Sequence, residues 1–210
     1  MELINQLKLQ LLFGSQGSVE RSFLLGFMHY AGLGVPQDYG QALSHYEKAA
    51  NLGSAWAEHS IGLMYEAGKG VEKNLKTAID WYSRASARGH VPATCALGLI
   101  HKFGPDDLRD QSQALKFFEQ AANAGSCMAA LQLADSLERG LGSGPSESAA
   151  RDWYFRAAQL SDESTAAAHA AIATLYREGR LGLGIDLIKA EEWASSSRKL
   201  LEALGLQSDL

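Results

Sequence analysis

Residues 62–71 read Gly-Leu-Met-Tyr-Glu-Ala-Gly-Lys-Gly-Val, and a related stretch, Gly-Phe-Met-His-Tyr-Ala-Gly-Leu-Gly-Val, stands 36 residues earlier at 26–35. The same spacing relates three sets of positions along the chain. These are Gly32, Gly68, Gly104 and Gly140; then Gly26, Gly62 and Gly98 with Ala134; then Tyr46, Tyr82, Phe118 and Tyr154. A fixed period of this size is the sequence signature of a stacked-repeat protein. We therefore expect an array of similar units around no single centre.

Each unit contains two signals for the start of a helix. Side chains that can accept a hydrogen bond from a free amide recur in two columns: Ser18, Ser54, Ser126 and Asp162, with His90 in the remaining place, and Asp38, Asn74, Asp110, Ser146 and Asp186. Two N-caps per period predict two helices per unit. The expected helices span 18–31, 38–52, 54–67, 74–88, 90–103, 110–124, 126–139, 146–160, 163–178 and 186–203.

The turns between units are expected to be short. Gly17, Gly53, Gly89 and Gly125 precede the first cap column, where a left-handed residue would end the previous helix. Ala and Leu dominate over Val and Ile, which favours helix over sheet. The fold class predicted is all-α, a right-handed α-solenoid superhelix of about five helix-turn-helix repeats with terminal capping helices.

The solenoid is expected to form one domain. Its parts are a capping helix over 1–17, four repeats over 18–53, 54–89, 90–125 and 126–161, a fifth repeat with the C-terminal cap over 162–203, and a tail over 204–210. Leu3, Leu7 and Leu11 recur every four residues in the capping segment. At the other end, the polar run 195–199 replaces an Ala-rich helix end, as a terminal cap requires.

Composition argues against several classes of partner. The net charge of −5, from 24 acidic and 19 basic residues, offers no basic stripe for nucleic acid or for a membrane surface. The chain shows no signal peptide and no segment of transmembrane length. Cys95 and Cys127 lie off the repeat period, and we interpret them as free thiols of a cytoplasmic protein, with a periplasmic or secreted location open if a leader was trimmed.

The stretches 62–71 and 32–39, the latter followed by Ala42, Tyr46 and Lys48-Ala49-Ala50, resemble the Sel-1-like repeats, a branch of the tetratricopeptide-like helical repeats. The resemblance covers residues 18 to about 198. It implies scaffold or adaptor work through protein–protein contacts, commonly in bacterial signalling, envelope and virulence systems. Some secreted members carry two bridging cysteines per unit, a pattern that this chain lacks.

The sequence offers no chemistry for a reaction. The six histidines occupy scattered positions without an H-E-x-x-H pair, which argues against a metal site. The run 179–184 has the glycines of a phosphate-binding loop, but helices rather than a strand are expected before it. Neither a Ser-His-Asp order nor a pair of carboxylates emerges. We expect no enzyme activity, no cofactor and no metal.

The first helices provide the functional signal. Projecting the helical period from the buried columns places one set of side chains on the concave wall. The predicted groove residues are Phe23, Phe27, Tyr30, Trp56, His59, Leu63, Glu66, Leu99, Lys102, Phe103 and Asp135. Trp56 is the leading candidate, because aromatic residues on a curved wall supply rigid contact area. The alternative is that Phe23, Phe27 and Leu63 only pack between adjacent first helices.

The leading hypothesis is a non-enzymatic scaffold that binds a polypeptide partner in its concave groove. Five first helices spaced about 8 to 10 Å apart would span about 40 Å, enough for an extended peptide of roughly ten residues or for one helix. A second hypothesis is an immunity or inhibitor protein that occludes a bacterial toxin or effector. A third, from another class, is an enzyme acting on cell-wall or lactam substrates. The convex face remains an alternative binding surface.

Overall fold

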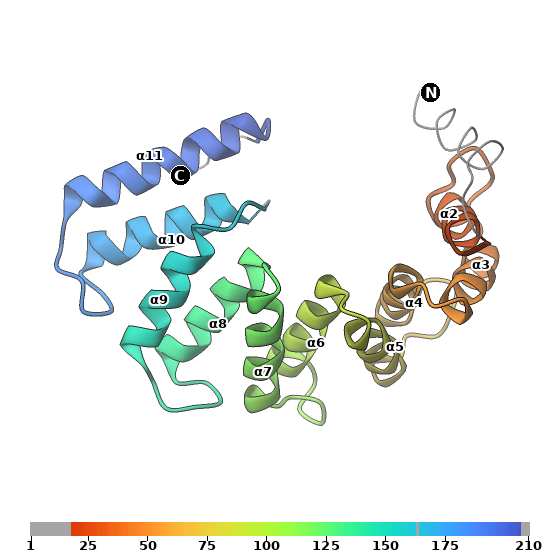
Figure 1. Cartoon of the computed structure of the whole chain (residues 1–210). Helices are drawn as coiled ribbons and strands as arrows, with labels where there is room; N and C mark the ends of the chain where they lie inside the picture. The colour runs from red at the N-terminus through yellow and green to blue at the C-terminus, as the bar shows by residue number, and fades with distance from the viewer. Residues whose placement is uncertain (1–17, 163, 207–210) are drawn as a thin grey trace. The chain divides into compact units, whose positions relative to one another are not determined.

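The computed structural model describes residues 18–162 and 164–206, and within these ranges every regular element is a helix. Figure 1 shows ten of them in chain order. They are α2 (Ser18–Ala31), α3 (Tyr39–Asn51), α4 (Ala55–Ala67), α5 (Leu75–Ala87), α6 (Val91–Phe103), α7 (Gln111–Asn123), α8 (Cys127–Arg139), α9 (Glu147–Ala157), α10 (Thr165–Glu178) and α11 (Leu187–Ala203). The all-α prediction and its ten helices are confirmed.

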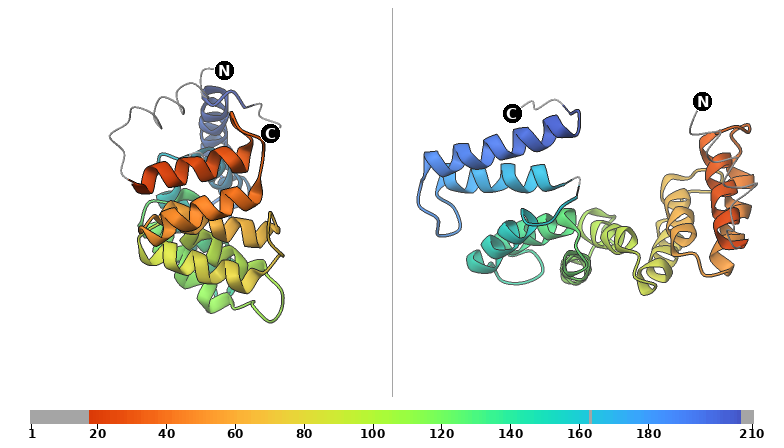
Figure 2. Two further views of the ribbon diagram at one scale, coloured as in Figure 1. Left: turned by 90° about the vertical axis from the view of Figure 1, so that its right-hand side faces the viewer. Right: turned by 45° about the horizontal axis from the view of Figure 1, so that its top comes forward.

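The chain divides into two compact units, Met1–Thr94 and Cys95–Leu210. In the first unit, α2 packs against α3, α3 against α4, and α4 against α5. In the second unit, α7 packs against α8, α8 against α9, and α10 against both α9 and α11. Consecutive helices lie side by side as hairpins, which is clearest for α10 and α11 (Figure 2). Each unit is therefore built from helix pairs that pack on their neighbours. The right-handed sense of the superhelix stays a prediction.

The glycines of one repeating column contact the aromatic rings of another, and this contact accounts for both. A Cβ atom added to Gly62 would lie 2.5 Å from Cε1 of Tyr82, and one added to Gly98 would lie 2.6 Å from Cε1 of Phe118. Gly26 and Tyr46 make the same contact in the first pair. In these three pairs the aromatic ring of the second helix thus rests directly on the backbone of the first helix. Only glycine permits this approach, and the rings end up buried.

Most of the predicted caps are confirmed. Asp38, Asn74, Asp110 and Asp186 each accept a hydrogen bond from the backbone N–H three residues later, and so do Ser54 and Ser126. The predicted left-handed turn is also confirmed at Gly53, Gly89 and Gly125, which all have positive φ. Gly17 and the expected capping helix over 1–17 lie outside the described residues.

The prediction that Asp162 is an N-cap is wrong, because the helix that it was expected to start begins only at Thr165. The Thr165 hydroxyl donates to the carbonyls of Leu160 and Asp162 and so stabilises a turn before the helix. The Asp162 carboxylate instead accepts from the N–H of Ser164 at 2.8 Å and from the N–H of Cys127 at 2.9 Å.

Two further details in the last two helix pairs differ from expectation. Ser146 makes no side-chain cap bond, and α9 ends at Ala157 rather than at residue 160. Ser197, expected on the polar outer face of the terminal cap, is fully buried, and its hydroxyl donates to the Ala166 carbonyl at 2.7 Å. That hydroxyl satisfies a carbonyl of α10, so this serine stabilises the packing of the last helix pair.

Candidate functional site

A hollow of about 440 Å³ opens in the first unit between α2 and the start of α4. Ser54 caps α4, accepting from the N–H of Ala57 at 3.2 Å, and this cap fixes where the first turn of the helix begins. The wall is apolar apart from Glu20 and the cap. Its lining residues are Val19, Glu20, Phe23, Leu24, Gly53, Ser54, Ala55 and Trp56. Two of the predicted groove residues, Phe23 and Trp56, therefore meet in one concave site.

Trp56 is exposed over 61% of its surface although it is the largest side chain of the hollow. Its ring packs edge-on against the ring of His90, with centroids 4.5 Å apart. His90 itself is buried. The imidazole therefore holds one edge of the indole while the rest of the indole faces solvent.

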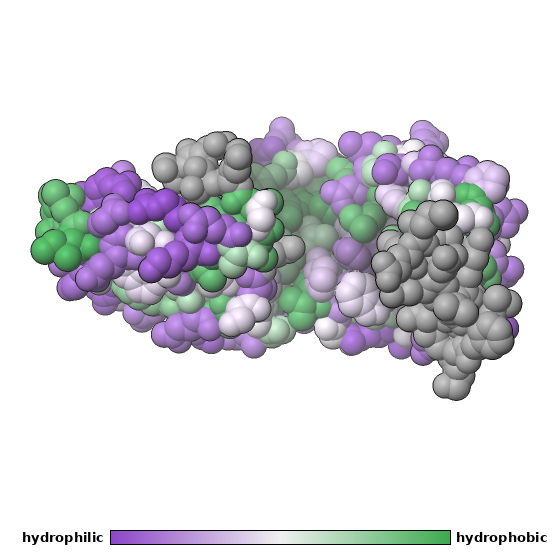
Figure 3. Space-filling view, turned by 90° about the horizontal axis from the view of Figure 1, so that it is seen from above, coloured by the Kyte–Doolittle hydropathy of each residue, from purple (hydrophilic) through white to green (hydrophobic). Residues whose placement is uncertain are grey.

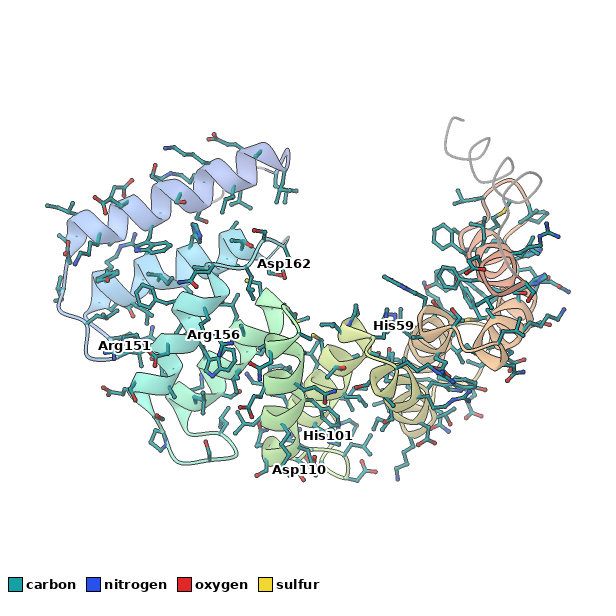
Figure 4. The ribbon with its side chains drawn as sticks, in the orientation of Figure 1. His59, His101, Asp110, Arg151, Arg156 and Asp162 are labelled. Carbon is teal, nitrogen blue, oxygen red and sulfur yellow. The ribbon has the colours of Figure 1, made fainter. Side chains whose placement is uncertain are left out.

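His59, labelled on α4 in Figure 4, lies one turn along the helix from Trp56. Its ring is 4.7 Å from that of His90 and 5.5 Å from that of Tyr82. Burial, and then the neighbouring His90, lower the pKa of His59 to about 4, and burial lowers the pKa of His90 as well. Both rings are therefore neutral near neutral pH. His90 Nε2 is buried without a hydrogen-bond partner.

A buried carboxylate supports this end of α4. Glu58 is fully buried, with Oε1 3.1 Å from the guanidinium of Arg84. Nε of Arg88 donates to the same Oε1 at 3.4 Å and lies 3.2 Å from Oε2, which has no hydrogen-bond partner. The two arginines belong to the end of α5. This ion-pair cluster ties the first turn of α4 to the following helix and is structural.

The hollow continues into an exposed apolar surface. Phe27 is four residues after Phe23 on α2, and Leu63 is seven residues after Trp56 on α4, so each lies on the same helical face as its partner in the hollow. Phe27 is 38% exposed and Leu63 is 42% exposed. We call the set Phe23, Phe27, Trp56 and Leu63 the aromatic patch.

Two other predicted groove residues of this unit use their polar atoms within the fold. The Tyr82 hydroxyl donates to Glu66 at 2.5 Å. Lys69 donates to the Tyr30 hydroxyl at 3.0 Å, and its ammonium lies over the rings of Tyr30 and Tyr39. Glu66 and Tyr30 therefore have partners within the fold, and a role for them in binding stays a prediction.

The remaining predicted residues belong to the second unit. Lys102 is buried, and its ammonium donates to Asp135 at 2.8 Å and to Gln132 at 2.9 Å. Asp135 also pairs with Arg139 at 2.7 Å. Leu99 is half-buried, whereas Phe103 is exposed. The structure thus brings Lys102 and Asp135 together as an ion pair between α6 and α8, and a role for them in binding stays a prediction.

The described residues contain neither a metal-binding cluster nor a reactive thiol. No group of three or more His, Cys, Asp or Glu side chains in the described ranges has the geometry for a metal ion. Burial raises the pKa of both thiols, that of Cys127 to about 12, so neither is an activated nucleophile. The two histidines contact aromatic rings, and their lowered pKa values follow from that burial. None of the helices from α2 to α11 is both long enough and apolar enough to span a bilayer.

Sequence reasoning missed His90 and the residues around the Ser54 cap as parts of the site. The signal available was the cap column itself, in which His90 stands where the four other repeats have Ser or Asp. A histidine at a cap position indicates a side chain used for something other than capping.

Comparison with known proteins identifies a family model that matches most of the chain. The family model described as Sel1 repeat matches residues 22–54, 57–90, 91–126, 127–162 and 166–200. No curated protein sequence matches the chain. A Sel1 repeat protein from Oxalobacter formigenes is 30% identical, with a TM-score of 0.77 over 86% of this chain and 73% of that one.

A second solved structure is c5321, a protective antigen of uropathogenic Escherichia coli with an SLR fold. It is 28% identical, with a TM-score of 0.76 over 94% of this chain and 41% of that one, so this chain spans less than half of its length. An immunity protein from Pseudomonas aeruginosa, Pa5087, is 16% identical with a TM-score of 0.44, a likeness that carries no argument about function.

Proposed function

The chain belongs to the Sel1 repeat family, and we propose that it is a non-enzymatic binding module whose aromatic patch captures a polypeptide segment of a partner protein. Sel1 repeat proteins are generally protein–protein interaction scaffolds and share the all-α solenoid fold. The proposal adds the place of binding and the kind of ligand. A non-enzymatic role agrees with the family, in which the repeats typically serve as interaction modules.

The observation that carries the proposal is the exposed indole of Trp56 beside a hollow. Tryptophan is among the residues most enriched in binding hot spots, which are typically centred on well-packed pockets. Contact with His90 restricts the indole before binding, so little side-chain entropy remains to be lost. A partner side chain in the hollow would contact Phe23, Leu24 and Trp56 together.

The dimensions favour a peptide anchored by one bulky side chain. The hollow, about 440 Å³, is at the lower end of ligand pockets, which measure about 300 to 1,000 Å³. Phe27 and Leu63 extend the apolar surface beyond it by one to two helical turns. A segment with one aromatic or aliphatic anchor and further apolar residues would cover the whole patch.

The test is selection of binders from a random peptide library displayed on phage, with the purified full chain as bait. We expect the selected peptides to share an apolar anchor. Their dissociation constants, measured by fluorescence anisotropy, should rise at least tenfold for Trp56→Ala and for Phe27→Ala. Each variant should keep the far-ultraviolet circular dichroism of the parent.

The matched control is Leu52→Ala, which removes an exposed apolar side chain that does not line the hollow. Binding to this variant should be unchanged. Peptides that bind Trp56→Ala and the parent equally well would show that the binding surface lies elsewhere on the chain.

A further inference from the structure

The first turn of α11 exposes apolar side chains at positions that, in earlier second helices, contact the neighbouring repeat. Gly70 packs on Tyr39 at the start of α3, and the Ser112 hydroxyl at the start of α7 donates to the Gly142 carbonyl at 3.0 Å. Leu187 and Ile188 occupy the corresponding places in α11 and are 66% and 75% exposed. Ile185, just before the helix, is exposed as well.

One face of α11 runs from this apolar turn along the helix. Its members line a common hollow and recur at helical spacing: Leu187, Ile188, Glu191, Glu192, Ser195, Ser196 and Lys199. Figure 3 shows hydrophilic residues along this helix and a hydrophobic cluster at one end of it. We call this set the α11 stripe.

The α11 stripe does not suit a further helix pair of the kind found within the chain. In the first repeat, Leu43 and Ala50 of α3 pack in the cluster that also includes Ala57 and Ile61 of α4. The residues that correspond to Leu43 and Ala50 in α11 are Glu191 and Arg198, which form an ion pair with each other. An apolar helix placed there would desolvate both charges without compensation. A partner for this face has to present charges of its own.

A second copy of α11 meets that requirement when it runs antiparallel across a twofold axis at Ser195. Each residue then faces the one equally far on the other side of position 195. Glu191 faces Lys199 of the second copy and Glu192 faces Arg198, and each pairing occurs twice because the axis is symmetric. Small side chains, Ser195 and its neighbours, stand at the crossing point, where two helices approach most closely.

The apolar ends match in the same register. Leu187 lies eight residues from the axis, about 12 Å along the helix. It faces Ala203 of the second copy, next to Leu204 and Leu206, which are also exposed. Glu202, opposite Ile188, is the one unmatched side chain of this alignment. We propose that the chain forms a twofold homodimer through antiparallel packing of two α11 helices.

The dimer is expected to be weak and sensitive to salt. Two helices of 17 residues give a contact at the lower end of specific interfaces, and much of its specificity comes from exposed charge pairs. A dissociation constant in the micromolar range follows. The aromatic patch is outside this interface, so dimerisation and peptide capture can fail independently.

The first test is sedimentation equilibrium of the full chain up to hundreds of micromolar, with two charge reversals. Glu191→Lys places two lysines face to face across the axis, and Lys199→Glu places two glutamates there. Each variant alone should dimerise at least tenfold more weakly than the parent. A one-to-one mixture should dimerise again, because every facing pair then consists of one Lys and one Glu.

The second test uses the twofold axis directly. Ser195→Cys should form a symmetric disulfide under mild copper phenanthroline oxidation, whereas Glu119→Cys, an exposed control on α7, should not. The native Cys95 and Cys127 are buried and should not react. A parent that stays monomeric, a mixture that fails to recover, or a Ser195→Cys chain that does not cross-link faster than the control would overturn the proposal. Trp56→Ala should leave the dimer intact.

Discussion

Replacing Gly62 by alanine tests the packing rule that three of the helix pairs share. The new methyl group would lie 2.5 Å from Cε1, 2.6 Å from Cδ1 and 3.1 Å from Cζ of Tyr82. Carbon atoms in good contact stand about 3.5 to 4.0 Å apart, so the ring has to retreat by roughly 1 Å. Tyr82 is fully buried and its hydroxyl is bound to Glu66, so a retreat strains the core and weakens that bond.

The fourth repeat shows what such a retreat looks like. Ala134 occupies the glycine column there, facing Tyr154. Tyr154 is 8% exposed, whereas Tyr82 is fully buried, and the hydrogen bond to its glutamate is 3.3 Å long rather than 2.5 Å. The alanine of the fourth repeat is therefore accompanied by a less buried ring and a longer hydrogen bond. The second repeat would have to reach the same arrangement without the neighbours that accommodate it in the fourth.

The free energies can be estimated term by term. Overpacking of a core by one methyl group costs about 1 to 3 kcal/mol. A weakened buried hydrogen bond adds about 1 kcal/mol, and the higher helix propensity of alanine returns about 1 kcal/mol. We expect Gly62→Ala to lower the free energy of unfolding by about 2 kcal/mol.

The assay is urea unfolding followed by tryptophan fluorescence and by circular dichroism, with Gly40→Ala as the matched control. Gly40 is also helical, but an added Cβ there meets only the Asp38 carboxylate, at 3.3 Å. The control should gain up to about 1 kcal/mol from propensity alone. If both variants shift stability in the same direction by similar amounts, the close contact between glycine and tyrosine does not govern the packing.

Three further predictions concern buried polar groups. The pKa of His59 is lowered to about 4, so an unfolded chain, with its histidine near 6.5, takes up protons first as the pH falls. The free energy of unfolding should therefore be highest above pH 6.5 and should fall by about 1 to 2 kcal/mol toward pH 4, a range that allows for the partial exposure of the ring. In thermal melts, His59→Leu should reduce this dependence on pH. Lys102→Met should lower the free energy of unfolding by about 1 kcal/mol, because Asp135 keeps its ion pair with Arg139. Lys102→Ala should lower it by about 3 kcal/mol, because the packing of the lysine side chain on Phe118 is lost as well. Urea titrations of the two variants compare these losses. Cys127 and Cys95, whose pKa values are raised by burial, should react with a thiol reagent only as fast as the chain unfolds, and rapid labelling of the folded chain would contradict this burial.

The sequence predicts this fold well because its strongest signals are repeated ones. The glycine that an aromatic ring rests on appears at three equivalent places, and the aspartate or asparagine that caps a second helix appears at four. Prediction fails where the period changes, in the segment 158–164, because the turn there depends on one threonine hydroxyl that binds two carbonyls. That arrangement has no counterpart among the other turns that the structure describes.

The proposed binding surface was predictable only in part. Helical periodicity placed Phe23 and Trp56 on one wall, since both belong to faces that repeat at known spacing, and the two residues line one hollow. The same reasoning put Lys102 and Asp135 on the groove wall, but it could not show that their charges, 33 residues apart, neutralise each other. Which polar side chains pair across two helices depends on rotamers and on distances of a few ångströms. These are set by packing and not by the period.

The internal repeats provide a control for interpreting Trp56. Positions that hold the helices together keep one kind of residue from repeat to repeat, such as the column of Tyr46, Tyr82, Phe118 and Tyr154. The column of Trp56 instead contains Glu20, Pro92 and Met128, three residues with nothing in common in size or charge. Packing therefore does not demand a tryptophan at this place. An indole that the fold does not require, left largely in water beside a hollow, costs solubility without contributing to stability, and binding of a partner is the physical gain that would offset that cost.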